Sequence, residues 1–172
     1  MIEILSATAL ATVQDLGRFG SLGYGVGTSG AMDHLALALG NLLLGNPEDA
    51  AAIEIPLFAF EVRLLQDCAF ALTGAACDAT LDGQPLPPNW VCQGREGQVL
   101  SLGYPTSGSR AYLCLAGGVD VPSVLGSRST QLRGEFGGLD GRALQQGDRL
   151  AALRPGLSTL ALDFGVLAPS LS

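Results

Sequence analysis

Hydrophobic and polar positions along the chain follow a helical period in one segment. In residues 31–44, the apolar positions that fall on one face of a helix are Leu35, Leu39, Leu42 and Leu43. Ser29 precedes this segment as a candidate N-cap, Asp33 lies in its first turn, and Gly45 follows as a candidate stop. The pattern predicts one main helix at about residues 31–44.

Elsewhere the apolar positions recur with a period of two, which is typical of strands. Phe58, Phe60, Val62 and Leu64 share one face, and further strands are expected at residues 2–7, 98–102, 110–115, 149–153 and 159–164. Asp82 and Gly83 form the dipeptide of a tight hairpin turn. One helix among about eight short strands predicts a mainly β fold, a barrel or a sandwich. We expect a single domain over residues 1–165 and a tail at 166–172.

Two glycine-rich stretches interrupt these periods, at residues 12–33 and 117–142. The second holds seven glycines together with Arg128, Arg133 and Arg142. Loops of this length inside a compact domain are uncommon and are usually functional or disordered. Its many apolar side chains argue against a solvated linker. We therefore expect an ordered loop that is shaped by glycine and presents arginines.

The first glycine-rich stretch brings Gln14, Asp15 and Arg18 close together in sequence. For an isolated pair of this kind the simplest interpretation is an ion pair that holds a surface turn. The segments GVGTSG (25–30) and GSRS (126–129) match neither a P-loop nor a dinucleotide fingerprint. Backbone N–H groups at a helix start can still bind an anion, and Arg128 or Arg133 could supply a planar guanidinium for a carboxylate or phosphate.

Composition excludes several classes of function. All nine cationic residues are arginine, so neither Schiff-base chemistry nor a P-loop lysine is possible within these 172 residues. The net charge of -7 disfavours a nucleic-acid partner. The four cysteines have no metal-binding spacing, and no metal site is expected. His34 is expected to be a half-exposed structural residue, because no GxSxG motif supports a hydrolase triad.

The N-terminal segment lacks the basic start of a signal peptide, and the longest apolar run is too short to span a bilayer. With unpaired-looking cysteines, this predicts a cytoplasmic protein without a membrane contact.

Four motifs in order carry a family resemblance: TVQDLGRFG (12–20), SGAMD (29–33), LTGAACDATLDG (72–83) and the long segment 111–150. Together they resemble the family of the 5-oxoprolinase C subunit, also known as biotin-dependent carboxyltransferase, allophanate hydrolase subunit 2 or antagonist of the Kip-type kinase inhibitor. The chain departs from many relatives at Ala76, where they carry an acid. Members are usually about twice as long, so the chain is expected to be a half-length form or an N-terminal portion.

The resemblance implies a cyclophilin-like β-barrel that works beside a B-type sister subunit of related fold, together with an A-type partner. It implies a component of an ATP-dependent 5-oxoprolinase, which opens 5-oxoproline to glutamate. Two alternatives remain: the carboxyltransferase part of a biotin-dependent urea carboxylase, using carboxybiotin, or a non-catalytic module that binds a Kip-type inhibitor. The substrate class would be small amides or lactams that carry a carboxylate.

Family-typical positions supply the candidate site residues. The candidates for catalysis or site shaping are Asp15, Arg18 and Asp33. The candidates for binding the substrate or an anion are Gln14, Ser29, Gly30, Gly117, Gly118, Arg128, Ser129, Thr130 and Arg142. Asn41, Thr73 and Gly74 are further family-typical positions without an assigned role.

Overall fold

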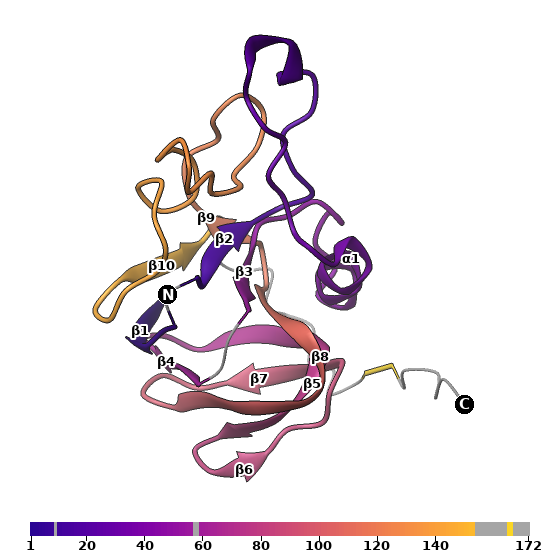
Figure 1. Cartoon of the computed structure of the whole chain (residues 1–172). Coiled ribbons are helices and arrows are strands. Elements are labelled where there is room, and N and C mark those ends of the chain that lie inside the picture. Colours follow the sequence, from indigo (N-terminus) through magenta and orange to yellow (C-terminus); the bar gives the residue numbers. More distant parts are fainter. Residues whose placement is uncertain (9, 57–58, 154–164, 167–172) are drawn as a thin grey trace.

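The computed structural model describes residues 1–8, 10–56, 59–153 and 165–166. Within these residues the fold is mainly β with a single α-helix (Figure 1). The elements in chain order are β1 (Ile2–Ser6), β2 (Thr12–Gln14), the 3-10 helix η1 (Leu22–Tyr24), α1 (His34–Leu43), β3 (Ala52–Ile55), β4 (Phe60–Leu64), β5 (Cys68–Leu81), β6 (Gln84–Pro85), β7 (Trp90–Gly94), β8 (Val99–Leu115), β9 (Val119–Asp120) and β10 (Arg149–Ala152).

The strands form one sheet that curls into a nearly closed barrel. Its hydrogen-bonded order is β2-β3-β8-β4-β1-β10-β9, and β5 adds to β8 while carrying β6 and β7. The path curls back on itself, because the N–H of Val119 in β9 donates to the carbonyl of Ala51, next to β3, at 2.8 Å. The expected barrel with one main helix is confirmed. The two strands expected at residues 98–102 and 110–115 are one continuous strand, β8, and the strand expected at 159–164 lies outside the described residues.

Alternation along the strands divides the apolar side chains into two cores. Those that point into the barrel include Ile53, Ile55 and Leu113, each at most 1% exposed. Those that point outward, such as Ala52, pack against α1 in a second cluster. Gly40 of α1 permits this contact, since a Cβ there would lie 2.6 Å from the sulfur of Cys114. Burial raises the pKa of the Cys114 thiol to about 12, as expected for a cysteine that only fills space.

The helix differs from its prediction at the N-terminus and in its buried face. Asp33, not Ser29, is the N-cap, and its carboxylate accepts the N–H of Ala36 at 3.0 Å. Ser29 has a φ of 52° and belongs to the preceding loop. The predicted apolar face is wrong in part, because Leu35 and Leu42 are exposed while the buried face includes Ala36, Leu37, Gly40, Asn41 and Leu43. The stop at Gly45 is confirmed by its φ of 70° and its bond to the carbonyl of Leu42.

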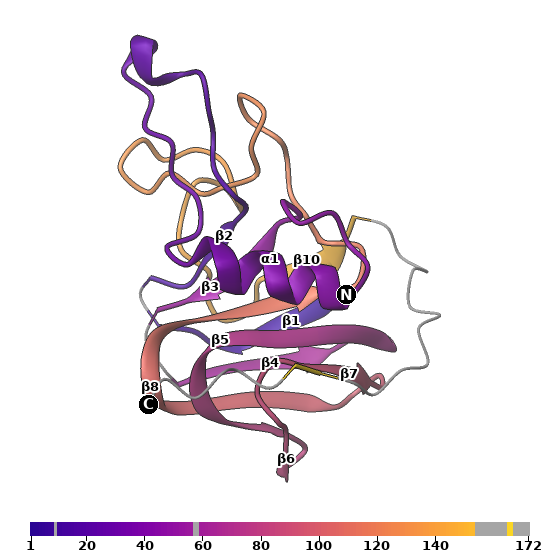
Figure 2. The ribbon, with the colours of Figure 1, turned by 90° about the vertical axis from the view of Figure 1, so that its right-hand side faces the viewer.

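The two glycine-rich stretches project from the same end of the barrel (Figures 1 and 2). The first forms a protruding arm whose two limbs cross where Gly17 meets Gly30. A Cβ on Gly30 would lie 2.9 Å from the Cα of Gly17, so only glycine fits at this crossing. Residues 121–142 fold beside the arm as an irregular loop (Figure 1). The turn at Asp82 and Gly83 is confirmed by left-handed φ values of 49° and 78°.

None of the four cysteines, all within the described residues, forms a disulfide bond, and His34 is exposed at the start of α1. In the described part of the chain, no helix has the length and apolarity needed to cross a membrane. The predicted domain boundary at residue 165 and the predicted cytoplasmic location stay predictions.

Candidate functional site

A row of polar side chains crosses the outer face of the sheet beside α1. The antiparallel register pairs Thr12 of β2 with Glu54 of β3, and Glu54 with Tyr112 of β8. Glu54 is the one polar residue of β3, whose other members are Ala52, Ile53 and Ile55. The register alone therefore brings an acid and a phenol together from segments that lie far apart in the sequence.

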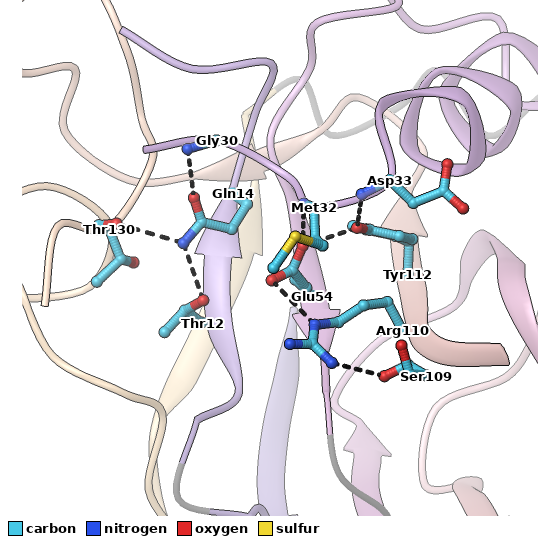
Figure 3. Close-up of polar contacts among 10 residues, drawn as sticks. All are labelled: Thr12, Gln14, Gly30, Met32, Asp33, Glu54, Ser109, Arg110, Tyr112 and Thr130. Carbon is cyan, nitrogen blue, oxygen red and sulfur yellow. Dashed lines mark hydrogen bonds and ion pairs between the residues drawn. The ribbon is translucent and has the colours of Figure 1, made fainter. Parts of the chain in front are cut away.

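Glu54 is the acid at the centre of this row, and its side chain is only 12% exposed (Figure 3). Its Oε2 accepts the N–H of Met32 at 2.7 Å and the hydroxyl proton of Tyr112 at 2.7 Å. The same hydroxyl accepts the N–H of Asp33 at 2.8 Å. Burial, followed by the hydrogen bond to Glu54, raises the pKa of Tyr112, so this phenol stays protonated as a donor.

Arg110 of β8 lies on the other oxygen of Glu54. Its Nε is 3.8 Å from Oε1, close enough for an ion pair but too far for a hydrogen bond. This Nε is buried and has no hydrogen-bond partner among the described residues. Arg110 lines a groove of about 280 Å³ next to Glu54 and a neighbouring hollow of about 440 Å³ next to Asp33. Because Arg110 lines both hollows, its guanidinium is suited to bind a carboxylate or carbonyl oxygen.

Gln14 holds the two glycine-rich stretches together at the groove. Its Nε2 donates to the hydroxyl of Thr12 at 2.9 Å and to the carbonyl of Thr130 at 3.3 Å. Its Oε1 accepts the N–H of Gly30 at 3.1 Å. Gln14, Ser29, Gly30 and Thr130, four of the predicted binding residues, line this groove together with Glu54 and Arg110. The side chain of Gln14 is thus committed to shaping the groove.

Asp15, the next residue, lines a separate cavity of about 170 Å³. Its Oδ1 accepts the hydroxyl protons of Ser127 and Ser129 and the N–H of Gly17, and its Oδ2 accepts the N–H of Arg128. The anion that the GSRS segment binds in this structure is therefore a carboxylate of the protein itself. Ser129 is fully buried, and the hydroxyl of Thr130 donates to the carbonyl of Val13, so neither hydroxyl is free.

Four predicted residues meet at this cavity: Asp15, Gly117, Gly118 and Arg128. The glycines adopt left-handed φ values of 92° and 76°, and their N–H groups donate to Asn46 and to the carbonyl of Leu115. Among the described residues, none lines both this cavity and the groove. The structure thus divides the predicted residues between two places.

Arg18 and Arg142 lie apart from both. Arg18 is fully buried, donates to the carbonyls of Val124 and Ser129, and stacks 4.8 Å from the ring centre of Phe136. Arg142 makes a two-pronged contact with Asp148 at 2.7 and 2.8 Å. This contact raises the pKa of Arg142 and lowers that of Asp148. The predicted roles of both arginines in a reaction stay predictions, and the observed contacts hold loops.

Sequence reasoning missed Glu54, Arg110 and Tyr112. The one sequence signal for this cluster was Glu54, the acid in the apolar segment AAIEIP, because a charged residue in a buried strand needs a polar partner. Within the described residues, no group of three or more His, Cys, Asp or Glu side chains is placed to hold a metal ion.

Comparison with known proteins places this geometry in a family. The family profile of the carboxyltransferase domain, subdomain A and B, matches residues 24–162. The chain is 47% identical over 150 residues to the C subunit of 5-oxoprolinase from Haemophilus influenzae, covering 87% of the chain and 48% of that protein. It is 41% identical over 150 residues to urea amidolyase of Saccharomyces cerevisiae, covering 87% of the chain and 8% of that protein.

Solved structures agree with this placement. The crystal structure of the K. lactis urea amidolyase superposes with a TM-score of 0.86 at 37% identity, over 98% of this chain and 10% of that one. The chain spans about half the length of its 5-oxoprolinase relative and a small part of the urea amidolyases. The chain therefore belongs to the family of carboxyltransferase domains of the subdomain A and B type.

Proposed function

We propose that this chain is a component of an ATP-dependent 5-oxoprolinase that acts with sister subunits to open 5-oxoproline to glutamate. The observation that carries the proposal is the 47% identity to the C subunit of 5-oxoprolinase over 87% of the chain. The sister subunits are a B-type protein of related barrel fold and an A-type protein. The complex acts in the cytoplasm.

The groove is the place where the substrate binds in this proposal. A lactam that carries a carboxylate offers an N–H donor and carbonyl and carboxylate acceptors. Glu54 Oε1 makes no hydrogen bond to Arg110 and can accept the N–H, while the guanidinium of Arg110, which lines the groove, can donate to an oxygen. Tyr112 and the N–H of Met32 fix Glu54 from the opposite side. Both groups are therefore oriented before the substrate arrives.

ATP fits the groove poorly. A triphosphate requires several cationic or backbone donors, and among the described residues Arg110 is the one cationic side chain that lines the groove, next to an acid. We assign nucleotide binding to one of the sister subunits. Asp15 and Arg128 face the separate cavity, so a direct role in the reaction requires that a partner or a movement brings them to the substrate.

A second candidate function is carboxyl transfer from carboxybiotin to a small amide. It is favoured by the family match over residues 24–162 and by the likeness to urea amidolyase. The guanidinium of Arg110 suits a carboxylate, so Arg110 would hold the carboxyl group of the carrier. Carboxybiotin supplies an activated carboxyl group when bound. Glu54 would orient the N–H of the acceptor amide.

The test is ATP-dependent release of glutamate from 5-oxoproline by the chain mixed with its sister subunits, with the chain omitted in parallel. We expect turnover only in the full mixture, and we expect Arg110→Ala to lower it about 100-fold or more. Arg133→Ala is the matched control, because Arg133 is exposed on the loop beside the arm. Assembly of each variant is checked by size-exclusion chromatography.

Turnover without the chain, or full turnover with Arg110→Ala in an intact complex, would contradict the proposal. Transfer of labelled carboxyl from carboxybiotin in place of glutamate release would support the second candidate. Assembly with sister subunits without either reaction would leave the non-catalytic binding module as the better description.

A further inference from the structure

The cavity beside Asp15 contains a buried cationic donor that the fold does not use. The Nε of Arg128 is buried and has no hydrogen-bond partner among the described residues. A buried donor without an acceptor is costly and in native proteins usually marks an unseen ligand, ion or water. The backbone N–H of Arg128 donates to the carboxylate of Asp15. Arg128 lines a cavity of about 170 Å³.

The other polar groups of the cavity wall are mostly satisfied. Asp15 accepts four hydrogen bonds, and the N–H groups of Gly117 and Gly118 already have acceptors. Asp49 also lines the cavity, and among the described residues its carboxylate has neither an ion pair nor a hydrogen bond. The charged groups left for a ligand are therefore one cation, Arg128, and one anion, Asp49.

We propose that this cavity binds a small α-amino acid, whose carboxylate contacts Arg128 and whose ammonium group faces Asp49. A phosphate or dicarboxylate is disfavoured, because one arginine would have to offset two negative charges with Asp15 and Asp49 nearby. The cavity is below the usual size range of sites for drug-sized ligands, which limits the occupant to a few heavy atoms beyond the amino acid backbone. Ala50, Val119 and Leu153 provide apolar wall for a short side chain.

This site is separate from the proposed reaction site. Within the described part of the chain, the groove and the cavity share no lining residue, and Gln14 lines the groove whereas Asp15 lines the cavity. The proposal therefore does not depend on the activity of the complex, and it can be tested on the 172-residue chain alone.

The experiment is a titration followed by amide NMR signals, with three probes of similar size: L-alanine, propionate and ethylammonium. Propionate lacks the ammonium group and ethylammonium lacks the carboxylate. Gly117, Gly118 and Gly126 report on the cavity, and Gly30 reports on the groove. We expect L-alanine to shift the cavity signals with a Kd below about 10 mM, propionate to bind about tenfold more weakly, and Gly30 to stay unchanged.

Two variants test which charged group of the ligand each residue contacts. Arg128→Gln should weaken L-alanine binding by about tenfold to a hundredfold, while Arg133→Gln should leave it unchanged. Asp49→Asn should bring L-alanine down to the affinity of propionate without changing propionate itself. Asp49 is exposed, so this variant keeps the fold even if Arg128→Gln does not.

An absent or non-saturating shift at the cavity signals would overturn the proposal. The same holds if Arg128→Gln folds and binds L-alanine normally, if Asp49→Asn leaves the preference for L-alanine over propionate intact, or if Gly30 shifts in step with the cavity signals.

Discussion

The groove and the cavity each contain a hydrogen-bonded acid and an arginine, yet they use them in opposite ways. In the groove, Glu54 accepts two hydrogen bonds through one oxygen and leaves its other oxygen towards Arg110. In the cavity, Asp15 accepts four hydrogen bonds through both oxygens, and the guanidinium of Arg128 is not one of its partners. Oδ1 of Asp15 accepts three of these hydrogen bonds and Oδ2 accepts one, so both oxygens hold the structure, whereas Glu54 has an oxygen without a hydrogen bond among the described residues that can act on a ligand. The number of free acceptor sites, rather than the residue type, separates the two.

The largest expected effect on stability comes from removing Asp15, and the largest effect on turnover from removing Glu54. Asp15→Ala leaves four donors without their acceptor and should lower the free energy of unfolding by roughly 3–5 kcal/mol. Glu54→Ala releases two donors and should cost about 1–2 kcal/mol, while abolishing turnover of the reconstituted complex. Urea denaturation of both variants measures the difference. Equal losses of stability in the Asp15 and Glu54 variants would contradict the distinction between the two acids.

An intermediate effect is expected at the crossing that forms the wall of the groove. Gly30→Ala combines a φ of 98° with a Cβ placed 2.9 Å from the Cα of Gly17, and should lower stability by about 2–3 kcal/mol. Gly20→Ala is the matched control, since it has a φ of 85° but nothing within 4 Å of the added Cβ, and should cost about 1 kcal/mol. Thermal unfolding of the two variants separates the cost of the steric clash at the crossing from the cost of a positive φ in a residue other than glycine. A Gly20→Ala loss as large as that of Gly30→Ala would show that the crossing itself contributes nothing.

The smallest expected effect concerns Arg142, which lines neither the groove nor the cavity. The contact with Arg142 holds the pKa of Asp148 below its ordinary value of 3.8. A depressed carboxyl pKa stabilises the fold above the unfolded-state pKa, and this contribution is lost as the pH falls through the folded pKa. Arg142→Ala should therefore lower stability at pH 7 by less than about 1 kcal/mol, because the pair is partly exposed, and should make no difference below the folded pKa.

Urea denaturation at several pH values between neutral and strongly acid conditions checks the Arg142 prediction. Turnover of the reconstituted complex should be unaffected in this variant. A loss of turnover without a loss of stability would show that Arg142 takes part in the reaction although it does not line the groove.

The parts of the fold that were predictable depend on neighbours in sequence. The turn at Asp82 and Gly83, the stop at Gly45 and the period-two strands follow from local backbone and side-chain preferences. The N-cap was misplaced because Ser29 is used in the crossing with the other limb of the arm, a contact that no local rule contains. The buried face of α1 was misassigned for the same reason, since the small residues Ala36 and Gly40 pack against the sheet and Leu35 is left exposed.

The candidate site was predictable only as two glycine-rich stretches. Sequence brought Gln14, Gly30 and Thr130 into one set, and they do meet in one groove. It could not separate them from Asp15 and Arg128, because whether a loop residue faces the groove or the cavity depends on how the loops pack on the barrel. Arg110 could not be predicted either, because β8 lies beside Glu54 only through strand pairing. The hydrogen bond from Tyr112 of β8 to Glu54 joins residues that are 58 positions apart.

The arm contacts have a further consequence for the order of folding. Arg18 binds Ser129, Asp15 binds Ser127, and Gln14 binds Thr130, across separations of 111, 112 and 116 residues. Contacts this distant in sequence are costly in loop entropy and form after local ones. During synthesis, the strands from β3 to β8 can pair while the arm still lacks its partner. The groove therefore cannot be completed before residues 130–132 have been made, and the cavity waits longer still, for Leu153.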